Sequence, residues 1–135
     1  MKMVFTNGCF DILHSGHVEY LNEAKALGDK LVVGLNSDAS VRRLKGDERP
    51  INSEQDRKFV LENLKAVDEV IVFDEDTPIN LIHSLKPSVL VKGGDWPPEK
   101  IVGYEFVISK GGVVHSLSFK DGYSTTSILE KIKSL

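Results

Sequence analysis

Two histidines near the amino terminus, His14 and His17, have a residue type and a spacing that suit phosphate chemistry. They stand three residues apart where a helical pattern begins, which is expected to place both imidazoles on one face of the first turn. Free backbone N–H groups and the positive end of the helix dipole attract phosphate to the same place. Gly16, between the histidines, lets a ligand approach the backbone. Imidazole donors there could stabilise a reacting phosphate; the alternative is ordinary capping or surface histidines.

Alternating strands and helices must position these residues. Apolar runs predict strands at residues 2–7, 30–36, 69–73, 88–92 and 112–117. Helices are expected at 18–27, from 37 or 38 to 44, from 53 to about 65, at 78–85, from 97 to about 109, and after Ser124. The last helix is expected to turn Ile128, Leu129 and Ile132 inward. The alternation predicts an α/β fold with a doubly wound parallel five-stranded sheet, helices on both faces and a single domain over residues 1–135.

Composition narrows the function classes. The 135 residues, 41% hydrophobic and 27% charged, are typical of one globular domain. No apolar run approaches the roughly 20 residues that span a bilayer, and no signal-peptide core is recognised, so a cytoplasmic location without a membrane partner is expected. Cys9 is the only cysteine, which excludes an internal disulfide and a cysteine-rich metal site. The net charge of −3 argues against nucleic-acid binding, and the missing GxGxxG and GxxxxGK[ST] patterns argue against NAD and P-loop chemistry.

Polar segments follow four of the predicted strands, at residues 7–11, 36–38, 92–96 and 117–126. Ligands of parallel α/β sheets bind at the carboxyl ends of strands, so one shared site is expected. In the last segment Gly122, Ser124, Thr125 and Thr126 precede a helix. Hydroxyls and free N–H groups at a helix start suit the β- and γ-phosphates of a triphosphate. The alternative is a helix cap alone.

Basic side chains surround residues 45–51, a polar segment with a glycine and a proline that is expected to be a mobile loop. Lys45 is the first choice for a phosphate ligand, because its side chain is flexible and it precedes the glycine. Arg43 and Arg49 are further candidates, with solvated surface charges as the alternative. Arg57, on the following helix, is either a phosphate ligand or a surface ion pair.

Lys92, Gly93 and Asp95 follow the fourth predicted strand. The glycine permits a base or ribose to approach the backbone, and the carboxylate can accept a hydrogen bond from a hydroxyl or amino group. The alternative is a common turn composition. Asp11 could steady a histidine or the nucleotide, or cap the turn. Cys9 is expected to contribute backbone groups, because no base is indicated that would activate its thiol.

The segment TNGCFDILHSGH, residues 6–17, resembles the signature of the HxGH nucleotidyltransferases of the cytidylyltransferase-like superfamily, which implies a Rossmann-like fold. The STT at residues 124–126 is similar to the start of that family's last helix, and RRLKGDERPI resembles a loop that closes over substrate phosphates. The likeness spans essentially the whole chain and looks closest to the heptose 1-phosphate adenylyltransferases. That closer match is carried by TNGCFDILHSGHVEYL, LNSDASVRRLKGDERPIN, VDEVIVFDEDTP, VLVKGGDW and DGYSTTSI.

The resemblance implies transfer of AMP from ATP to a sugar 1-phosphate, giving an ADP-sugar and pyrophosphate, by a homodimer without a resident metal. Mg²⁺ would arrive with the triphosphate. His14, His17 and Lys45 would be catalytic, and Arg43, Arg49 and Arg57 would contact substrate phosphates. The implied nucleotide-binding residues are Asn7, Gly8, Cys9, Phe10, Asp11, Gly16, Lys92, Gly93, Asp95, Gly122, Ser124, Thr125 and Thr126.

Two other functions stay open. The first is a CTP-dependent cytidylyltransferase acting on glycerol 3-phosphate or a similar alcohol phosphate. Such relatives carry an arginine where this chain has Phe119, three residues before the glycine of the last motif, so the CTP assignment does not transfer simply. The second is a nucleotide-binding regulatory module that has lost catalysis. The intact pair of His14 and His17 argues against it, because binding alone would not require both.

Overall fold

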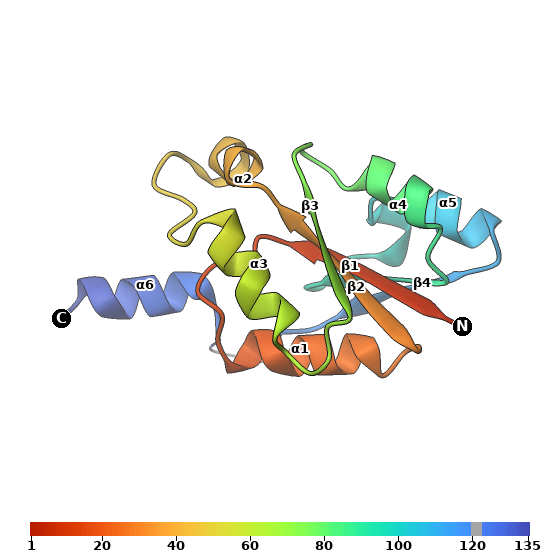
Figure 1. Ribbon diagram of the computed structural model, residues 1–135, viewed down its shortest axis with the longest axis horizontal. Helices are drawn as coiled ribbons and strands as arrows, with labels where there is room; N and C mark the ends of the chain where they lie inside the picture. Colours follow the sequence, from red (N-terminus) through yellow and green to blue (C-terminus); the bar gives the residue numbers. More distant parts are fainter. Residues whose placement is uncertain (120–122) are drawn as a thin grey trace.

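The structure is a computed structural model, which describes residues 1–119 and 123–135. In the described residues the strands are β1 (Met3–Gly8), β2 (Lys30–Asn36), β3 (Glu69–Phe73), β4 (Val89–Gly93) and β5 (Val113–Leu117). They pair in parallel in the order β3-β2-β1-β4-β5 (Figure 1). The predicted doubly wound parallel sheet is therefore confirmed. The order reverses between β1 and β4, which is where such sheets bind ligands, at the carboxyl ends of the strands.

Helices cover both faces of the sheet. One apolar cluster joins α1 (Ser15–Lys25) and α3 (Glu54–Glu62) to one face, through Leu21 and Leu61 among others. The other cluster joins α4 (Ile79–Leu85) and α5 (Tyr104–Ser109) to the opposite face, through Ile82 and Val107. Successive strand residues point to opposite faces, so both sides of each central strand are buried and the strands read as continuous apolar runs.

Three helices differ from their predicted bounds by about three residues or more. The first begins at Ser15, with His14 as its N-cap, instead of at residue 18, and α3 ends at Glu62 instead of at about residue 65. The helix expected from 97 to about 109 is interrupted: a short 3₁₀ turn (Pro98–Lys100) precedes α5. Between them Gly103 takes a φ of +92°, a left-handed conformation that ends one helical segment before the next begins. The glycine was visible in the sequence, but its left-handed backbone was not.

The expectation that Ile132 faces inward is wrong. No residue of α6 (Thr125–Lys133) is buried, Ile128 and Leu129 are half-buried, and Ile132 is 56% exposed. Figure 1 shows α6 extending away from the body, with the carboxyl terminus at its far end. The amphipathic pattern identified the helix correctly, but both sheet faces are already covered by other helices.

α2 (Asp38–Lys45) follows the carboxyl end of β2.

No helix in the described parts of the chain is both long and apolar enough to cross a bilayer.

Candidate active site

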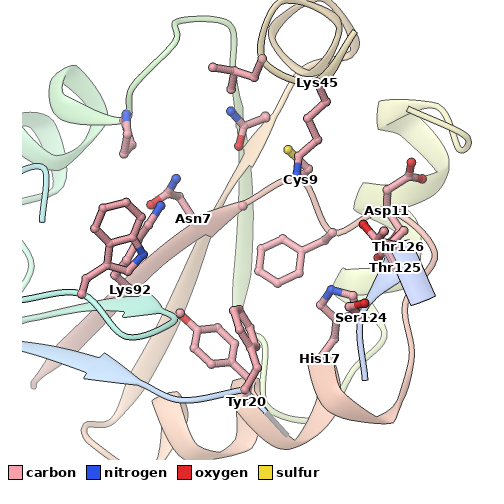
Figure 2. A pocket seen from close by; sticks show the side chains of 18 of the residues that line it. Asn7, Cys9, Asp11, His17, Tyr20, Lys45, Lys92, Ser124, Thr125 and Thr126 are labelled. Carbon is pink, nitrogen blue, oxygen red and sulfur yellow. The ribbon is translucent and has the colours of Figure 1, made fainter. Parts of the chain in front are cut away.

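A cavity of about 580 Å³ lies at the carboxyl edge of the sheet, and segments following all five strands line it (Figure 2). The four polar segments predicted from the sequence thus each contribute residues to one cavity. The predicted site residues that line it are Asn7, Gly8, Cys9, Phe10, Asp11, His14, His17, Lys45, Arg49, Lys92, Gly93, Ser124, Thr125 and Thr126. Gly122 lies outside the described residues. Gly16, Arg43, Arg57 and Asp95 are not among the lining residues.

His14 and His17 hold each other at the start of α1. The Nδ1 atom of His14 accepts a hydrogen bond from the backbone N–H of Gly16 at 3.0 Å. The Nδ1 atom of His17 accepts from the backbone N–H of His14 at 3.3 Å. The ring centroids are 4.0 Å apart. Because a nitrogen that accepts cannot carry a proton, both neutral rings must carry theirs on Nε2.

Their surroundings keep both histidines neutral. Burial lowers the pKa of His14 below its usual range. Burial, with a smaller contribution from His14, lowers the pKa of His17 to about 4. Within the described residues, the Nε2 atom of His14 is buried and has no hydrogen-bond partner. The pair therefore offers neutral N–H donors at the cavity, and one of them lacks an acceptor that a ligand oxygen could supply.

The start of α1 provides fewer free backbone donors than the sequence led us to expect. The N–H of Gly16 is used by the His14 ring, and the N–H of His17 donates to the carbonyl of His14 at 3.0 Å. A Cβ on Gly16 would lie 2.8 Å from the His14 ring and 3.0 Å from the Cβ of Tyr123. The glycine is thus required by its protein neighbours, and the donors of this site are the imidazoles.

Asp11 joins three segments of the site. It is 1% exposed, and its carboxylate accepts from the backbone N–H groups of Ile51 at 2.6 Å and Asn52 at 3.0 Å. The guanidinium of Arg49 pairs with it at 3.3 Å. Its own carbonyl accepts from the hydroxyl of Thr125 at 2.6 Å. Both carboxylate oxygens are therefore engaged by the protein, which gives Asp11 a structural position between the 45–52 loop and α6.

The β1–α1 turn around Asp11 is conformationally unusual. Phe10 and Ile12 both have positive φ angles, 48° and 50°. Such conformations cost an ordinary residue about 1 kcal/mol or more and persist where the surroundings impose them. Here the hydrogen bonds from Ile51 and Asn52 to Asp11, which lies between Phe10 and Ile12, hold the turn in this conformation.

Four basic side chains of the described residues line the cavity, and they come from different segments: Lys45, Arg49, Lys92 and Lys100. Lys45, at the end of α2, points toward Cys9 (Figure 2). Arg49 lines the cavity next to Asp11. Lys92, at the end of β4, has its pKa lowered by burial, and its ammonium lies 5.9 Å from the centre of the Trp96 ring. Burial also raises the pKa of the Cys9 thiol, which keeps it protonated and unsuited to nucleophilic attack.

Three predicted contacts are engaged elsewhere. Arg57 is 2% exposed and neither of the expected alternatives describes it: its guanidinium donates to three backbone carbonyls and to Asp38, at 2.7 to 3.0 Å. Arg43 does not line the cavity; it pairs at 2.9 Å with Asp76, which does. Asp95 is exposed and accepts from the hydroxyl of Ser118 at 3.2 Å. No sequence pattern distinguished these long-range contacts from phosphate binding.

At the start of α6, Ser124 is the N-cap and accepts from the N–H of Ser127 at 2.9 Å. Thr125 is tied to Asp11, while Thr126 also lines the cavity. Capping and cavity lining therefore coexist in this segment.

Several lining residues were not predicted. Tyr20 is buried and bonded to the Thr6 hydroxyl at 2.5 Å, and burial raises its pKa to about 12. Trp96 and Phe119 bring aromatic rings to the β4–β5 side, and Tyr123 lines the cavity near His14. Asp76, Thr77 and Pro78 follow β3. The strand-end rule would have found this last group, had it been applied to the third predicted strand.

The acidic residues that line the cavity are Asp11 and Asp76, and both already accept from arginine. In residues 1–119 and 123–135 no cluster of three or more His, Cys, Asp or Glu side chains could hold a metal ion.

The chain resembles known proteins along nearly its whole length. The family model described as cytidylyltransferase-like matches residues 5–131. The bifunctional protein HldE of Geotalea uraniireducens is 61% identical over 133 residues, which cover 98% of this chain and 27% of that protein. HldE of Helicobacter pylori (strain ATCC 700392 / 26695) is 59% identical over 132 residues, 98% of this chain and 28% of that protein. The chain thus spans about a quarter of the length of these relatives.

Solved structures extend the comparison. The lipopolysaccharide core biosynthesis protein from Thermoplasma volcanium superposes with a TM-score of 0.70 at 34% identity, covering 92% of this chain and 99% of that one. Pantoate-beta-alanine ligase from Francisella tularensis, at 15% identity and a TM-score of 0.55, shares the fold alone.

Proposed function

This chain belongs to the cytidylyltransferase-like family, and from that premise we propose that it transfers AMP from ATP to a heptose 1-phosphate, releasing pyrophosphate. The observation that carries the proposal is the pair of neutral Nε2–H donors on His14 and His17, beside cavity-lining cations. The choice of a heptose rests on the sequence resemblance, on the HldE relatives and on a structural relative named for lipopolysaccharide core biosynthesis.

The reaction requires positioning and charge stabilisation, without a covalent enzyme intermediate. An oxygen of the sugar phosphate attacks the α-phosphorus of ATP in line; the new P–O bond forms as the bond to the β-phosphate oxygen breaks, and pyrophosphate leaves. The Nε2–H groups of His14 and His17 donate to the α-phosphoryl oxygens, where negative charge builds up. Lys45 neutralises charge from the opposite side, and residues 124–126 hold the departing pyrophosphate.

Mg²⁺ is part of the substrate in this proposal, carried by the triphosphate as that ion commonly is. The aromatic rings of Trp96 and Phe119 favour placing the base on the β4–β5 side, since flat apolar surfaces suit a purine. ATP supply implies work in the cytoplasm. A homodimer is proposed on the resemblance and is tested by light scattering of the purified protein.

A substrate panel tests the function. Four nucleoside triphosphates are combined with heptose 1-phosphate, mannose 1-phosphate, glycerol 3-phosphate and ethanolamine phosphate, and pyrophosphate release is followed with Mg²⁺ present. ATP with heptose 1-phosphate is expected to give the highest kcat/KM. A preference for CTP would overturn the choice of substrates while leaving the histidine chemistry in place. If no pair released pyrophosphate, a regulatory module would replace the enzyme.

A further inference from the structure

The loop that follows β3 reaches the cavity but has no task in the mechanism above. Its residues Asp76, Thr77 and Pro78 line the cavity. β3 is an edge strand of the sheet, separated from β1 by β2, whereas Trp96 and Phe119 follow β4 and β5 on the other side of β1. The cavity therefore has two sides: an aromatic one after β4 and β5, and a polar one after β3.

The polar side is fixed in place from behind by α2 and its N-cap. The hydroxyl of Ser37 donates to the carboxylate of Asp74, and the guanidinium of Arg43 donates to the carbonyl of Asp74. The hydroxyl of Ser40 donates to the carbonyl of Glu75 at 3.0 Å. The carboxylate of Glu75 in turn accepts from the backbone N–H of Asp74 at 3.1 Å. Two of three consecutive acidic residues are thus used to anchor the loop.

The third acidic residue is held differently. One oxygen of Asp76 accepts from the Nε of Arg43 at 2.9 Å. Among the described residues, no protein group bonds the other oxygen of Asp76 or the hydroxyl of Thr77; both side chains are exposed, so a bound ligand would replace water at these atoms. A carboxylate can accept several hydrogen bonds, and a threonine hydroxyl can both donate and accept. The anchored loop thus presents unused hydrogen-bonding capacity to the cavity, and this matches a ligand rich in hydroxyl groups.

Charge decides how such a ligand must lie. Lys45, Lys92 and Lys100 line the same cavity and attract a phosphate group, while the carboxylate of Asp76 repels it. A sugar phosphate therefore places its phosphate among the lysines and its hydroxyl groups toward Asp76 and Thr77. Hydroxyl groups donating to an ionised carboxylate form the stronger, charge-assisted class of hydrogen bond.

We infer that Asp76 and Thr77 recognise the hydroxyl groups of the acceptor sugar, and so determine acceptor specificity. The inference rests on the proposed function, because it assumes a sugar phosphate acceptor. It gives a role to the end of the VDEVIVFDEDTP segment, none of whose residues were among the predicted site residues.

The test compares the steady-state kinetics of Asp76→Asn and Thr77→Val with the wild type, with heptose 1-phosphate and MgATP varied separately. Both substitutions keep the size of the side chain while removing a charge or a hydroxyl group. Loss of a hydrogen bond to a bound hydroxyl typically lowers affinity about ten- to a hundredfold when one partner is charged, and less when both are neutral. The KM for heptose 1-phosphate should therefore rise about tenfold or more in Asp76→Asn and severalfold in Thr77→Val. The KM for ATP should stay within about twofold of the wild type.

Glu75→Gln is the matched control. It removes a negative charge from the residue next to Asp76, the side chain of Glu75 does not line the cavity, and the amide oxygen can still accept from the N–H of Asp74. Unfolding temperatures of all variants confirm that they fold. A heptose 1-phosphate KM unchanged in both Asp76→Asn and Thr77→Val would overturn the inference, as would an equal rise in Glu75→Gln. Failure of the proposed function is a separate result, because it would show as a wild-type protein that releases no pyrophosphate with this sugar phosphate.

Discussion

At the scale of single residues, the two nitrogens of the His14 ring have different roles. The Nδ1 atom of His14 caps α1 by accepting from Gly16, while its Nε2 atom is buried without a partner among the described residues. The same ring therefore contributes to helix stability through one nitrogen and to the proposed chemistry through the other. Substitutions can be chosen that keep the first task and remove the second.

Replacing His14 by asparagine should preserve the fold and remove catalysis. Asparagine is a good N-cap, so the amide oxygen can accept from Gly16, but no donor reaches the position of Nε2. We expect kcat to fall ~10²–10³-fold, the usual loss for one donor to a charged transition state. His14→Ala should lose about 1 kcal/mol of stability in addition. Pyrophosphate release and urea unfolding measure the two effects; kcat above about half of the wild-type value would contradict the catalytic role.

His17 should make the ligand-free protein less stable in mild acid. Its pKa is about 4 when folded and about 6.5 when unfolded. Between these values the unfolded chain binds a proton that the folded protein does not, so stability is present above about pH 6.5 and is lost as pH falls toward about 4. Urea unfolding at several pH values should show a smaller loss for His17→Asn than for the wild type. Parallel curves for both proteins would show that His17 titrates normally.

At the scale of elements, the site depends on contacts between segments far apart in the sequence. The sequence predicted which segments at the ends of strands line the cavity, because the HxGH and STT patterns are local. It could not predict that Arg57 joins the ends of β1 and β2 to the loop before α3, because a buried arginine and a surface arginine look alike in a helix pattern. It also misplaced Ile132, since periodicity identifies an apolar face without showing what covers it.

Asp11→Asn should loosen the 45–52 loop. An amide group presents an N–H to one of the backbone donors, Ile51 or Asn52, that the carboxylate now accepts from. Leaving such a donor unpaired costs about 1–3 kcal/mol. Trypsin should therefore cut after Lys45 several times faster than in the wild type, and MgATP with acceptor should slow the cut in both. Asp56→Asn, on the exposed side of α3, is the control that should behave as the wild type. Equal cleavage rates in Asp11→Asn and the wild type would show that the hydrogen bonds from Ile51 and Asn52 to Asp11 do not restrain the loop.

At the scale of the molecule, stability resides in the sheet and the helices that cover it, while α6 contributes its first turn to the site. Leu21 is fully buried against the sheet, whereas α6 has no buried residue. The two ends of the chain therefore differ in what a substitution should do.

Leu21→Ala should cost about 2–5 kcal/mol, the usual loss for a truncated core leucine. Ile132→Ser should change stability by no more than about 0.5 kcal/mol in the monomer. Urea unfolding compares the two variants under the same conditions. A large loss for Ile132→Ser that depended on protein concentration would show that this face is covered by a second copy.

The parallel sheet also has a practical consequence for handling the protein. β1 begins at the edge opposite the cavity, and all five strands run toward the cavity, so Met1 lies away from it (Figure 1). Coupling to a solid support through the amino terminus should therefore leave the cavity open and preserve turnover. Amine-reactive coupling at random lysines would also modify Lys45 and Lys92, which line the cavity, so an immobilised catalyst made in that way should lose most of its activity.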